Sequence, residues 1–387
     1  MKTRPSFHVV LIKPSHYDDE GYVIQWGRSA IPSNTLAALN TLAMDCAARR
    51  VLGEHVPIQV EIYDETNMVI PTKRIITRIR QGLGGMIGFV GVQTNQFPRS
   101  LDLGRTFLRA GIPVVIGGFH VSGCYAMLKA LPPDIQQALA EGFTLIAGEA
   151  EGHLDALLHD AYTKRLKSSY NFLSTTPSLE GIPPPFLPAS LVKRTFRRLS
   201  SFDAGRGCPF QCSFCTIINV QGRTSRSRSA DDIETLIRAN LQQGVWRFFI
   251  TDDDFARNKG WEPILDRMIQ IREKEGLPLS LTIQVDTLCH KIPRFIEKAV
   301  RAGCHNIFIG LESLNPESLV GAKKRQNKIW EYRKMLQAWK NHGCTTVGGY
   351  ILGFPTDTPA SIARDIEILK KELPVDIVEF FILTPLP

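Results

Sequence analysis

The chain has 387 residues, of which 43% are hydrophobic and 22% are charged, and this composition excludes a disordered or collagen-like protein. No run of eighteen apolar residues predicts a membrane span, and the N-terminus lacks the apolar region of a secretory signal, so we expect a cytoplasmic protein with no membrane partner. The net charge of +8 comes mostly from scattered basic residues, with two short basic segments at 192–201 and 222–232. We therefore expect no nucleic-acid partner, while an anionic ligand stays open.

The first 165 residues alternate between apolar strand patterns and helical patterns. The strands are expected at 8–12, 58–64, 85–92, 112–118 and 143–149, each followed by a helical segment. Two of the inner strands are almost wholly apolar, which is typical of a parallel sheet that is buried on both faces. The pattern predicts a flavodoxin-like, doubly wound parallel sheet over residues 1–165.

A segment rich in proline, serine and threonine follows at 166–200, and it contains three consecutive prolines. Proline cannot occupy the interior of a helix, so we expect a linker.

Alternation resumes over residues 201–387. Strands are expected at 201–207, 246–254, 279–287, 305–313, 345–355 and 375–387, and helices at 229–243, 262–275, 293–302, 327–341 and 359–371. The first of these helices begins with a capping-box pattern, Ser229-x-x-Asp232. Six strands with intervening helices predict a partial (β/α)6 barrel, in which the active site forms at the carboxyl ends of the strands.

Three cysteines occur close together in "GRGCPFQCSFC", residues 205–215. Zinc usually requires four ligands in two pairs, and a second pair is absent, while a disulfide is not expected in a reducing compartment. Three soft thiolates on a tight loop suit an iron–sulfur cluster, and they leave one iron of a four-iron cube open to a substrate. Cys289, Cys304 and Cys344 are single, lie in apolar surroundings, and are expected to be buried thiols.

The CxxxCxxC spacing resembles the signature of the radical S-adenosylmethionine (radical SAM) superfamily. This resemblance implies that Cys208, Cys212 and Cys215 hold a 4Fe–4S cluster whose open iron chelates S-adenosylmethionine. It further implies reductive cleavage of S-adenosylmethionine to a 5′-deoxyadenosyl radical. Phe214 matches the aromatic residue that lies near the adenine in this family.

Three further segments are similar to the S-adenosylmethionine contacts of that superfamily. "FFITDDDF" offers Asp252 and Asp253 for the methionine ammonium, although the choice among its three aspartates is open. "IFIGLESLNPESL" offers Glu312 for the ribose or the methionine end, and "GGYILGFPTDT" offers Gly353 for the adenine. Exposed carboxylates in a turn and a glycine at a strand bulge are the alternative interpretations.

A parallel α/β domain ahead of such a barrel resembles the cobalamin-binding subgroup. "GVQTNQFP" and "VVIGGFHVSG" end two strands of the first sheet and place candidate corrin contacts at its carboxyl edge. These candidates are Gln93, Thr94, Gly117, Gly118 and His120. The D-x-H-x-x-G segment of cobalamin-dependent mutases is absent, so neither His16 nor His120 is expected on the cobalt. A domain of this fold that has lost its cofactor is the alternative.

The expected function is therefore radical chemistry on a small-molecule substrate, with cobalamin used for methyl transfer to carbon and with flavodoxin or ferredoxin as electron donor. The catalytic side chains, the substrate and the oligomeric state are not predicted. Radical cyclisation or rearrangement without methyl transfer, a non-catalytic iron–sulfur redox sensor, and a nucleic-acid modifier acting through residues 192–228 are the alternatives. Because relatives continue beyond "FFILTPLP", we also expect the barrel domain to be truncated at its C-terminus.

Overall fold

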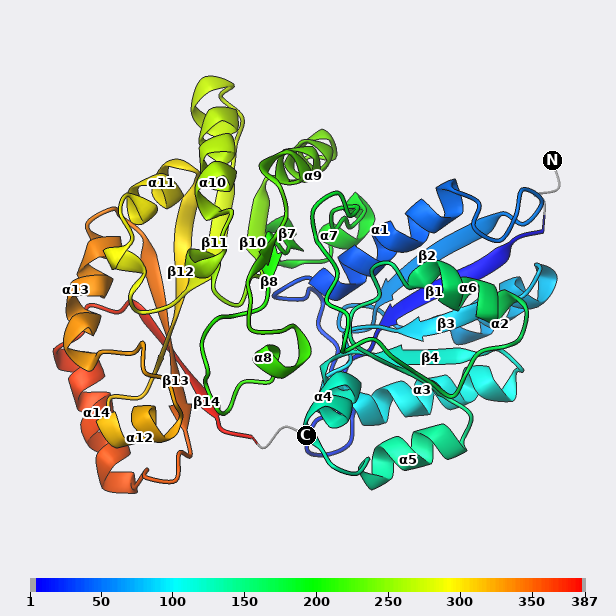
Figure 1. The fold of residues 1–387 in the computed structure, drawn as a ribbon, viewed down its shortest axis with the longest axis horizontal. Coiled ribbons are helices and arrows are strands. Elements are labelled where there is room, and N and C mark those ends of the chain that lie inside the picture. Colours follow the sequence, from blue (N-terminus) through cyan, green and yellow to red (C-terminus); the bar gives the residue numbers. More distant parts are fainter. Residues whose placement is uncertain (1–4, 385–387) are drawn as a thin grey trace.

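The computed structural model describes residues 5–384 and contains two six-stranded sheets, each entirely parallel (Figure 1). The first sheet has the strand order β2-β1-β3-β4-β5-β6. Its strands are β1 (Phe7–Lys13), β2 (Ile58–Asp64), β3 (Gly85–Phe89), β4 (Val114–Gly117), β5 (Thr144–Ala147) and β6 (Ser169–Asn171). The order 2-1-3-4-5 is that of a flavodoxin-like sheet, so the predicted fold of the first half is confirmed.

Helices cover both faces of this sheet because β1 is apolar on both. Val9 and Leu11 pack in one core with α1 and α6, whereas Val10 and Ile12 pack in a second core with α2 and α3. Successive side chains of a strand point to opposite faces, which separates the two cores. The helices are α1 (Asn34–Ala48), α2 (Thr72–Gln81), α3 (Phe97–Arg109), α4 (Phe119–Met127), α5 (Pro133–Ala140) and α6 (Leu154–Tyr162).

The segment expected to be a linker is only partly irregular. Its first residues form β6, which extends the first sheet beside β5, and it also contains the one-turn helix α7 (Ala189–Val192). Leu145 N–H donates to the carbonyl of Ser168 and draws this short polar strand to the sheet edge. The sequence did not predict this strand, because three residues are too few to carry a periodic signal.

The second sheet has the order β14-β13-β12-β11-β10-β7 and forms the predicted open barrel of six parallel strands. Its strands are β7 (Leu199–Phe202), β10 (Arg247–Ile250), β11 (Ser280–Val285), β12 (Cys304–Glu312), β13 (Thr345–Leu352) and β14 (Ile377–Ile382). The last expected strand therefore ends before residues 385–387, which lie outside the described residues. The expected first strand is split, with β7 followed by the short hairpin strands β8 (Gly205–Arg206) and β9 (Arg226–Ser227).

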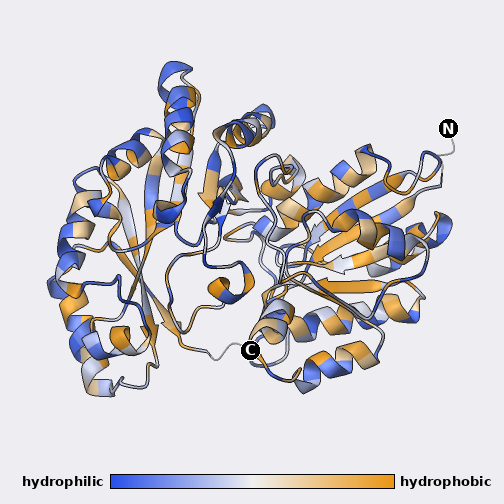
Figure 2. Cartoon of the chain, in the orientation of Figure 1, coloured by the Kyte–Doolittle hydropathy of each residue, from blue (hydrophilic) through white to orange (hydrophobic). Residues whose placement is uncertain are grey.

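The barrel helices lie on the outer side of this sheet, and Figure 2 shows hydrophilic residues on these helices and hydrophobic residues along the strands. The helices are α9 (Ala230–Gln242), α10 (Trp261–Ile269) with a further turn at 270–274, α11 (Phe295–Arg301), α12 (Pro316–Gly321), α13 (Ile329–Lys340) and α14 (Pro359–Lys371). At the start of α9 the hydroxyl of Ser229 accepts from Asp232 N–H and the Asp232 carboxylate accepts from Ser229 N–H, which confirms the predicted capping box. No helix within residues 5–384 has the length and apolarity that crossing a membrane would require.

The loop that carries the three cysteines lies between the two sheets, together with the short helix α8 (Ile217–Val220) (Figure 1). Helix α8 contacts α4 of the first domain. The predicted site residues of both domains therefore face a common region.

Candidate active site between the two sheets

The cysteine loop leaves β8 through a glycine that no other residue can replace without strain. Gly207 has a φ of +86°, and a Cβ at this position would lie 2.5 Å from the carbonyl oxygen of Thr224. Beyond it, the loop is held by few backbone hydrogen bonds, among them Cys208 N–H to Gly222 and Cys215 N–H to Cys212. Its shape is therefore set at its ends more than along its length.

The thiol of Cys212 is buried, and those of Cys208 and Cys215 are partly buried. Burial, with the nearby Asp254 and Asp253 carboxylates, raises the pKa of Cys208 to about 12, and burial also raises the pKa of Cys215. Within residues 5–384 no three His, Cys, Asp or Glu side chains are already arranged as a metal site. Three soft sulfur donors on one short loop nevertheless fit an iron–sulfur cluster by their chemistry.

Phe214 lies in a small apolar cluster beside the turn that follows β13. Its ring centroid is 6.0 Å from that of Phe354. Gly353 precedes Phe354 and has a φ of +103°, which favours glycine. The Asp357 carboxylate accepts the N–H groups of Gly353 and Phe354, both at 2.9 Å, and so holds this turn in shape.

The first two aspartates that follow β10 have different surroundings. One oxygen of the Asp252 carboxylate accepts the N–H groups of Ala204 and Gly205, at 2.7 and 2.9 Å, and the other accepts from Asn258. Burial raises the pKa of Asp252 to about 7. Asp252 therefore anchors the chain that leads into the cysteine loop. Both oxygens of its carboxylate already accept hydrogen bonds from the protein.

Burial likewise raises the pKa of Asp253 to about 7, but the side chain of Asp253 has no hydrogen-bond partner on another residue among those described. The Asp253 carboxylate acts on the pKa of both Cys208 and Cys215. Of the two sequence candidates, Asp253 is thus the one whose charge acts on the thiols and whose carboxylate accepts no hydrogen bond from another described residue.

Glu312 ends β12 with a left-handed backbone, φ +64°, at a register shift opposite β13. Its carboxylate forms a buried ion pair with Lys324. Burial lowers the pKa of Lys324, but Glu312, Cys212 and Asp254 together outweigh this effect, and the pKa is raised overall. The ammonium nitrogen also lies 5.8 Å from the centre of the Phe214 ring. The sequence prediction missed Lys324, whose only signal was the basic run "KKRQNK".

Gln93 and Thr94 of the first domain line a cavity of about 340 Å³ together with Phe214 and Cys215 of the second. This cavity brings residues predicted for cobalamin and residues predicted for the cluster and S-adenosylmethionine to one space. His120 is buried behind Thr94, with its Nδ1 3.3 Å from the Thr94 hydroxyl and its Nε2 2.9 Å from the Asp134 carboxylate. It is not among the residues that line the cavity, and its link to the cavity is the hydrogen bond with Thr94.

Gly117 and Gly118 line a second, mostly apolar cavity of about 180 Å³ at the carboxyl edge of the first sheet. The backbone of Val92 already occupies the position that a Cβ on Gly118 would take. Gly118 is therefore required by packing within the protein, while Gly117 has more room, with the nearest atom 3.5 Å from its Cβ position.

An ionic junction joins the two domains beside this second cavity. The Arg206 guanidinium lies 2.8 Å from Glu149, 2.7 Å from Glu151 and 3.0 Å from Asp203. Both glutamates belong to the first domain, whereas Arg206 immediately precedes the cysteine loop. This pairing could not be predicted from the sequence, because ion pairs between distant segments have no periodic pattern.

Comparison with known proteins agrees with this geometry. Residues 203–369 match the model of the Radical SAM superfamily. The chain is similar to bacteriochlorophyllide d C-12(1)-methyltransferase of Chlorobaculum tepidum, with 30% identity over 71% of this chain and 58% of that protein. It is also similar to the hopanoid C-2 methylase of Rhodopseudomonas palustris, with 28% identity over 64% of this chain and 46% of that protein. The chain thus spans less than two thirds of the length of these relatives.

Two solved structures share the fold across 97% of this chain. The radical S-adenosylmethionine methyltransferase TsrM from Kitasatospora setae, with tryptophan and a SAM analog bound, has a TM-score of 0.73 and 16% identity over 73% of its chain. The cobalamin-dependent enzyme OxsB, with aqua-cobalamin and S-adenosylmethionine bound, has a TM-score of 0.69 and 18% identity over 53% of its chain. The cysteine motif, the parallel barrel and the family match together identify residues 203–369 as a radical SAM domain.

Proposed function

We propose that this protein is a cobalamin-dependent radical SAM methyltransferase that acts on a carbon of a small molecule. The observation that carries this proposal is the cavity lined by Gln93, Thr94, Phe214 and Cys215, because two cofactors must converge on one substrate. When bound, the cluster and S-adenosylmethionine supply a carbon-centred radical, and cobalamin supplies a methyl group.

The side chains of the barrel are proposed to bind and orient S-adenosylmethionine. Cys208, Cys212 and Cys215 hold the cluster, and the free Asp253 carboxylate meets the methionine ammonium. Asp252 holds the segment that precedes the cysteine loop, because its carboxylate accepts the N–H groups of Ala204 and Gly205. A carboxylate beside a cation is the arrangement that general electrostatics favours in a buried site.

Glu312 and Lys324 form a second polar group, on the opposite side of Phe214 from the first domain. We propose that this pair binds the ribose hydroxyls or the methionine end of S-adenosylmethionine. Gly353, with Phe214 and Phe354 nearby, leaves an apolar space for the adenine.

The first domain is proposed to bind the corrin over the carboxyl edge of its sheet. Gln93 and Thr94 face the shared cavity, Gly117 lines the apolar cavity beside it, and His120 positions the Thr94 hydroxyl. Because Asp134 and Thr94 already occupy both ring nitrogens of His120, no histidine ligand to cobalt is proposed.

The reaction consumes one electron for each S-adenosylmethionine cleaved, so the protein requires a donor of the flavodoxin or ferredoxin type. All eight cysteines are unpaired, which suits a reducing compartment, and we propose a cytoplasmic location.

Protein purified without oxygen tests both halves of the proposal. We expect bound iron and sulfide, a corrin spectrum that survives gel filtration after incubation with hydroxocobalamin, and 5′-deoxyadenosine after reduction with dithionite. A spectrum without corrin bands would remove cobalamin from the proposal, and a cluster without 5′-deoxyadenosine would favour a redox sensor.

The ligand assignment is tested with one cysteine inside the loop and one outside it. Cys212→Ala should lose the iron, whereas Cys289→Ala, which removes a buried thiol outside the loop, should keep it. Stoichiometric iron in Cys212→Ala would contradict the assignment.

A further inference from the structure

The solvent side of the cysteine loop adjoins a surface with a strong positive charge. Lys323 and Arg325 are exposed and Lys328 is half-buried, and none of them forms a salt bridge within residues 5–384. The acidic residue of this segment, Glu331, is already paired with Lys291 and is close to His290. We call Lys323, Arg325, Lys328 and the exposed Trp330 the basic rim.

The basic rim contains an exposed aromatic side chain next to its cations. Trp330 is 77% exposed, and the ammonium of Lys328 lies 5.7 Å from its ring centroid. Tryptophan and arginine are the side chains that most often contribute the binding energy of a protein interface. A rim of this kind is therefore suited to a protein partner of opposite charge.

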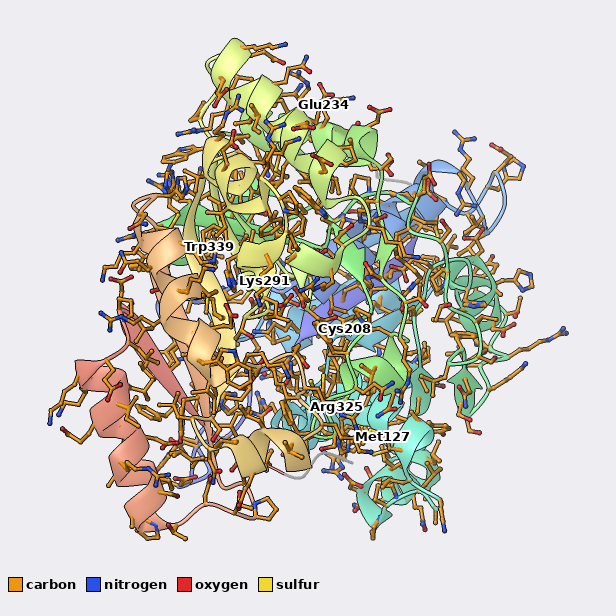
Figure 3. The ribbon with its side chains drawn as sticks, turned by 60° about the vertical axis from the view of Figure 1, so that its left-hand side comes forward. Met127, Cys208, Glu234, Lys291, Arg325 and Trp339 are labelled. Carbon is orange, nitrogen blue, oxygen red and sulfur yellow. The ribbon has the colours of Figure 1, made fainter. Side chains whose placement is uncertain are left out.

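Direct contacts connect the basic rim to the cysteine loop. Ser213 N–H donates to the carbonyl of Ala322 at 2.9 Å, and the Gln326 side-chain amide lies 3.5 Å from the Cys212 sulfur. Gln211 and Ser213 are exposed, so the outer side of the loop is continuous with the rim. In the view of Figure 3, Cys208 lies between Lys291 and Arg325.

We propose that the basic rim is the docking site for an acidic electron-donor protein of the flavodoxin or ferredoxin type. This inference rests on the proposed function, because it supplies the electron that the cluster needs. The donor is oxidised by one electron and the cluster is reduced by one, with no bond made or broken and no proton transferred. A donor on the rim contacts the loop at the residues that flank the Cys212 sulfur.

A second basic surface provides a matched control. Arg28, Arg197, Arg198 and Arg247 line a cavity of about 340 Å³ at the beginning of β7 and β10. The cysteine loop lies past the carboxyl ends of the strands, so this arginine cavity is at the opposite end of the sheet. Lys323 and Arg197 even share the same left-handed backbone, with φ of 54° at each.

Binding is measured first, with a flavodoxin and a bacterial-type ferredoxin as probes and the anaerobically purified protein as target. The dissociation constant should rise between about 50 and 300 mM salt, because exposed charges are screened. The double variant Lys323→Glu/Arg325→Glu should weaken binding about tenfold or more at low salt, whereas Arg197→Glu/Arg198→Glu should change it less than about twofold.

Reduction of the cluster is measured next, by electron paramagnetic resonance, with reduced flavodoxin or dithionite as the reductant. The rim variant should lose reduction by flavodoxin and keep reduction by dithionite, which needs no docking site. If dithionite yields no 5′-deoxyadenosine in the unmodified protein, the proposed function fails, while the binding result still decides the docking site.

Three results would overturn the docking site. The first is that neither donor binds. The second is that the two double variants lose donor affinity equally. The third is that single-stranded RNA binds in a way that depends on Lys323 and Arg325, while donor binding does not depend on them.

Discussion

The ionic junction and the cysteine loop lie next to each other along the chain and are built in opposite ways. At the junction, Arg206 is paired with three carboxylates, and Arg228, which is fully buried, adds a further pair with Asp203. In the loop, the Cys212 sulfur accepts a hydrogen bond from the Gln326 side chain, and no regular element spans residues 208–215. The junction is fixed by ion pairs between its own side chains, whereas few hydrogen bonds hold the loop.

This difference indicates that the two regions have different structural roles. Buried ion pairs fix relative orientation because breaking one leaves an uncompensated charge. The junction therefore holds the two domains, and the cavity between them, in place. The loop is left adaptable so that its thiols can close around a cofactor.

The largest expected effect comes from breaking the junction. Arg206→Ala leaves Glu151 buried without a partner and should lower the free energy of unfolding by about 3–5 kcal/mol. Arg238→Ala, which removes an exposed arginine from its pairs with Glu234 and Glu275, should lower the free energy of unfolding far less, because solvent screens exposed ion pairs. Urea denaturation of the cofactor-free proteins gives both values, and equal losses would show that the junction does not hold the domains together.

A smaller effect on stability is expected from Asp252, which binds the chain between the junction and the loop. Asp252 keeps its proton to about pH 7 when folded but only to about pH 4 when unfolded, so its contribution to stability falls as pH rises between these values. Asp252→Asn removes this titration. The free energy of unfolding should then decline less steeply with pH, by up to about 1.4 kcal/mol per pH unit. Thermal unfolding from pH 5 to 7 measures the slope.

The control for this slope is Asp376→Asn. Hydrogen bonds from Thr346 outweigh burial and hold the pKa of Asp376 below its usual value, so this group titrates below the measured range. The slope should then match that of the unmodified protein. An unchanged slope in Asp252→Asn would contradict the assigned role of burial at Asp252.

The smallest effect is expected in the turn that packs against the loop. Gly353→Ala forces a left-handed backbone on alanine and should cost about 1–2 kcal/mol. Gly321→Ala, in α12, meets no atom within 4 Å and has no left-handed backbone, so it should be neutral or slightly stabilising. We expect the lower melting temperature in Gly353→Ala. A lower melting temperature in Gly321→Ala would show that the turn at Gly353 relaxes to accommodate alanine.

The two sheets could be predicted from the sequence because their strands follow a simple rule. Strands such as β1 contain an unbroken apolar run, at residues 9–12, and the helices between the strands have clear starts, such as Ser229 with Asp232 at α9. Helix α12 was missed because its six residues begin with a proline and end with a glycine, a pattern that is also typical of a loop. Short elements carry too few residues for periodicity to show.

The site was predictable in its motif but not in its side-chain directions. Asp252 and Asp253 are identical neighbours in sequence, and only the N–H groups of Ala204 and Gly205 decide which carboxylate turns inward. Lys324 looked like one more exposed cation, yet its partner Glu312 draws it into the core. Such choices depend on contacts between segments that are far apart in the chain.

The contact between Gln326 and Cys212 spans 114 residues and has a consequence for how the protein is made. The three cysteines leave the ribosome well before the segment that covers Cys212 has been synthesised. At roughly 5–20 residues per second, this interval lasts on the order of 6–23 seconds. During that time the barrel is incomplete and the thiols are uncovered, so assembly of the cluster and completion of the fold overlap in time.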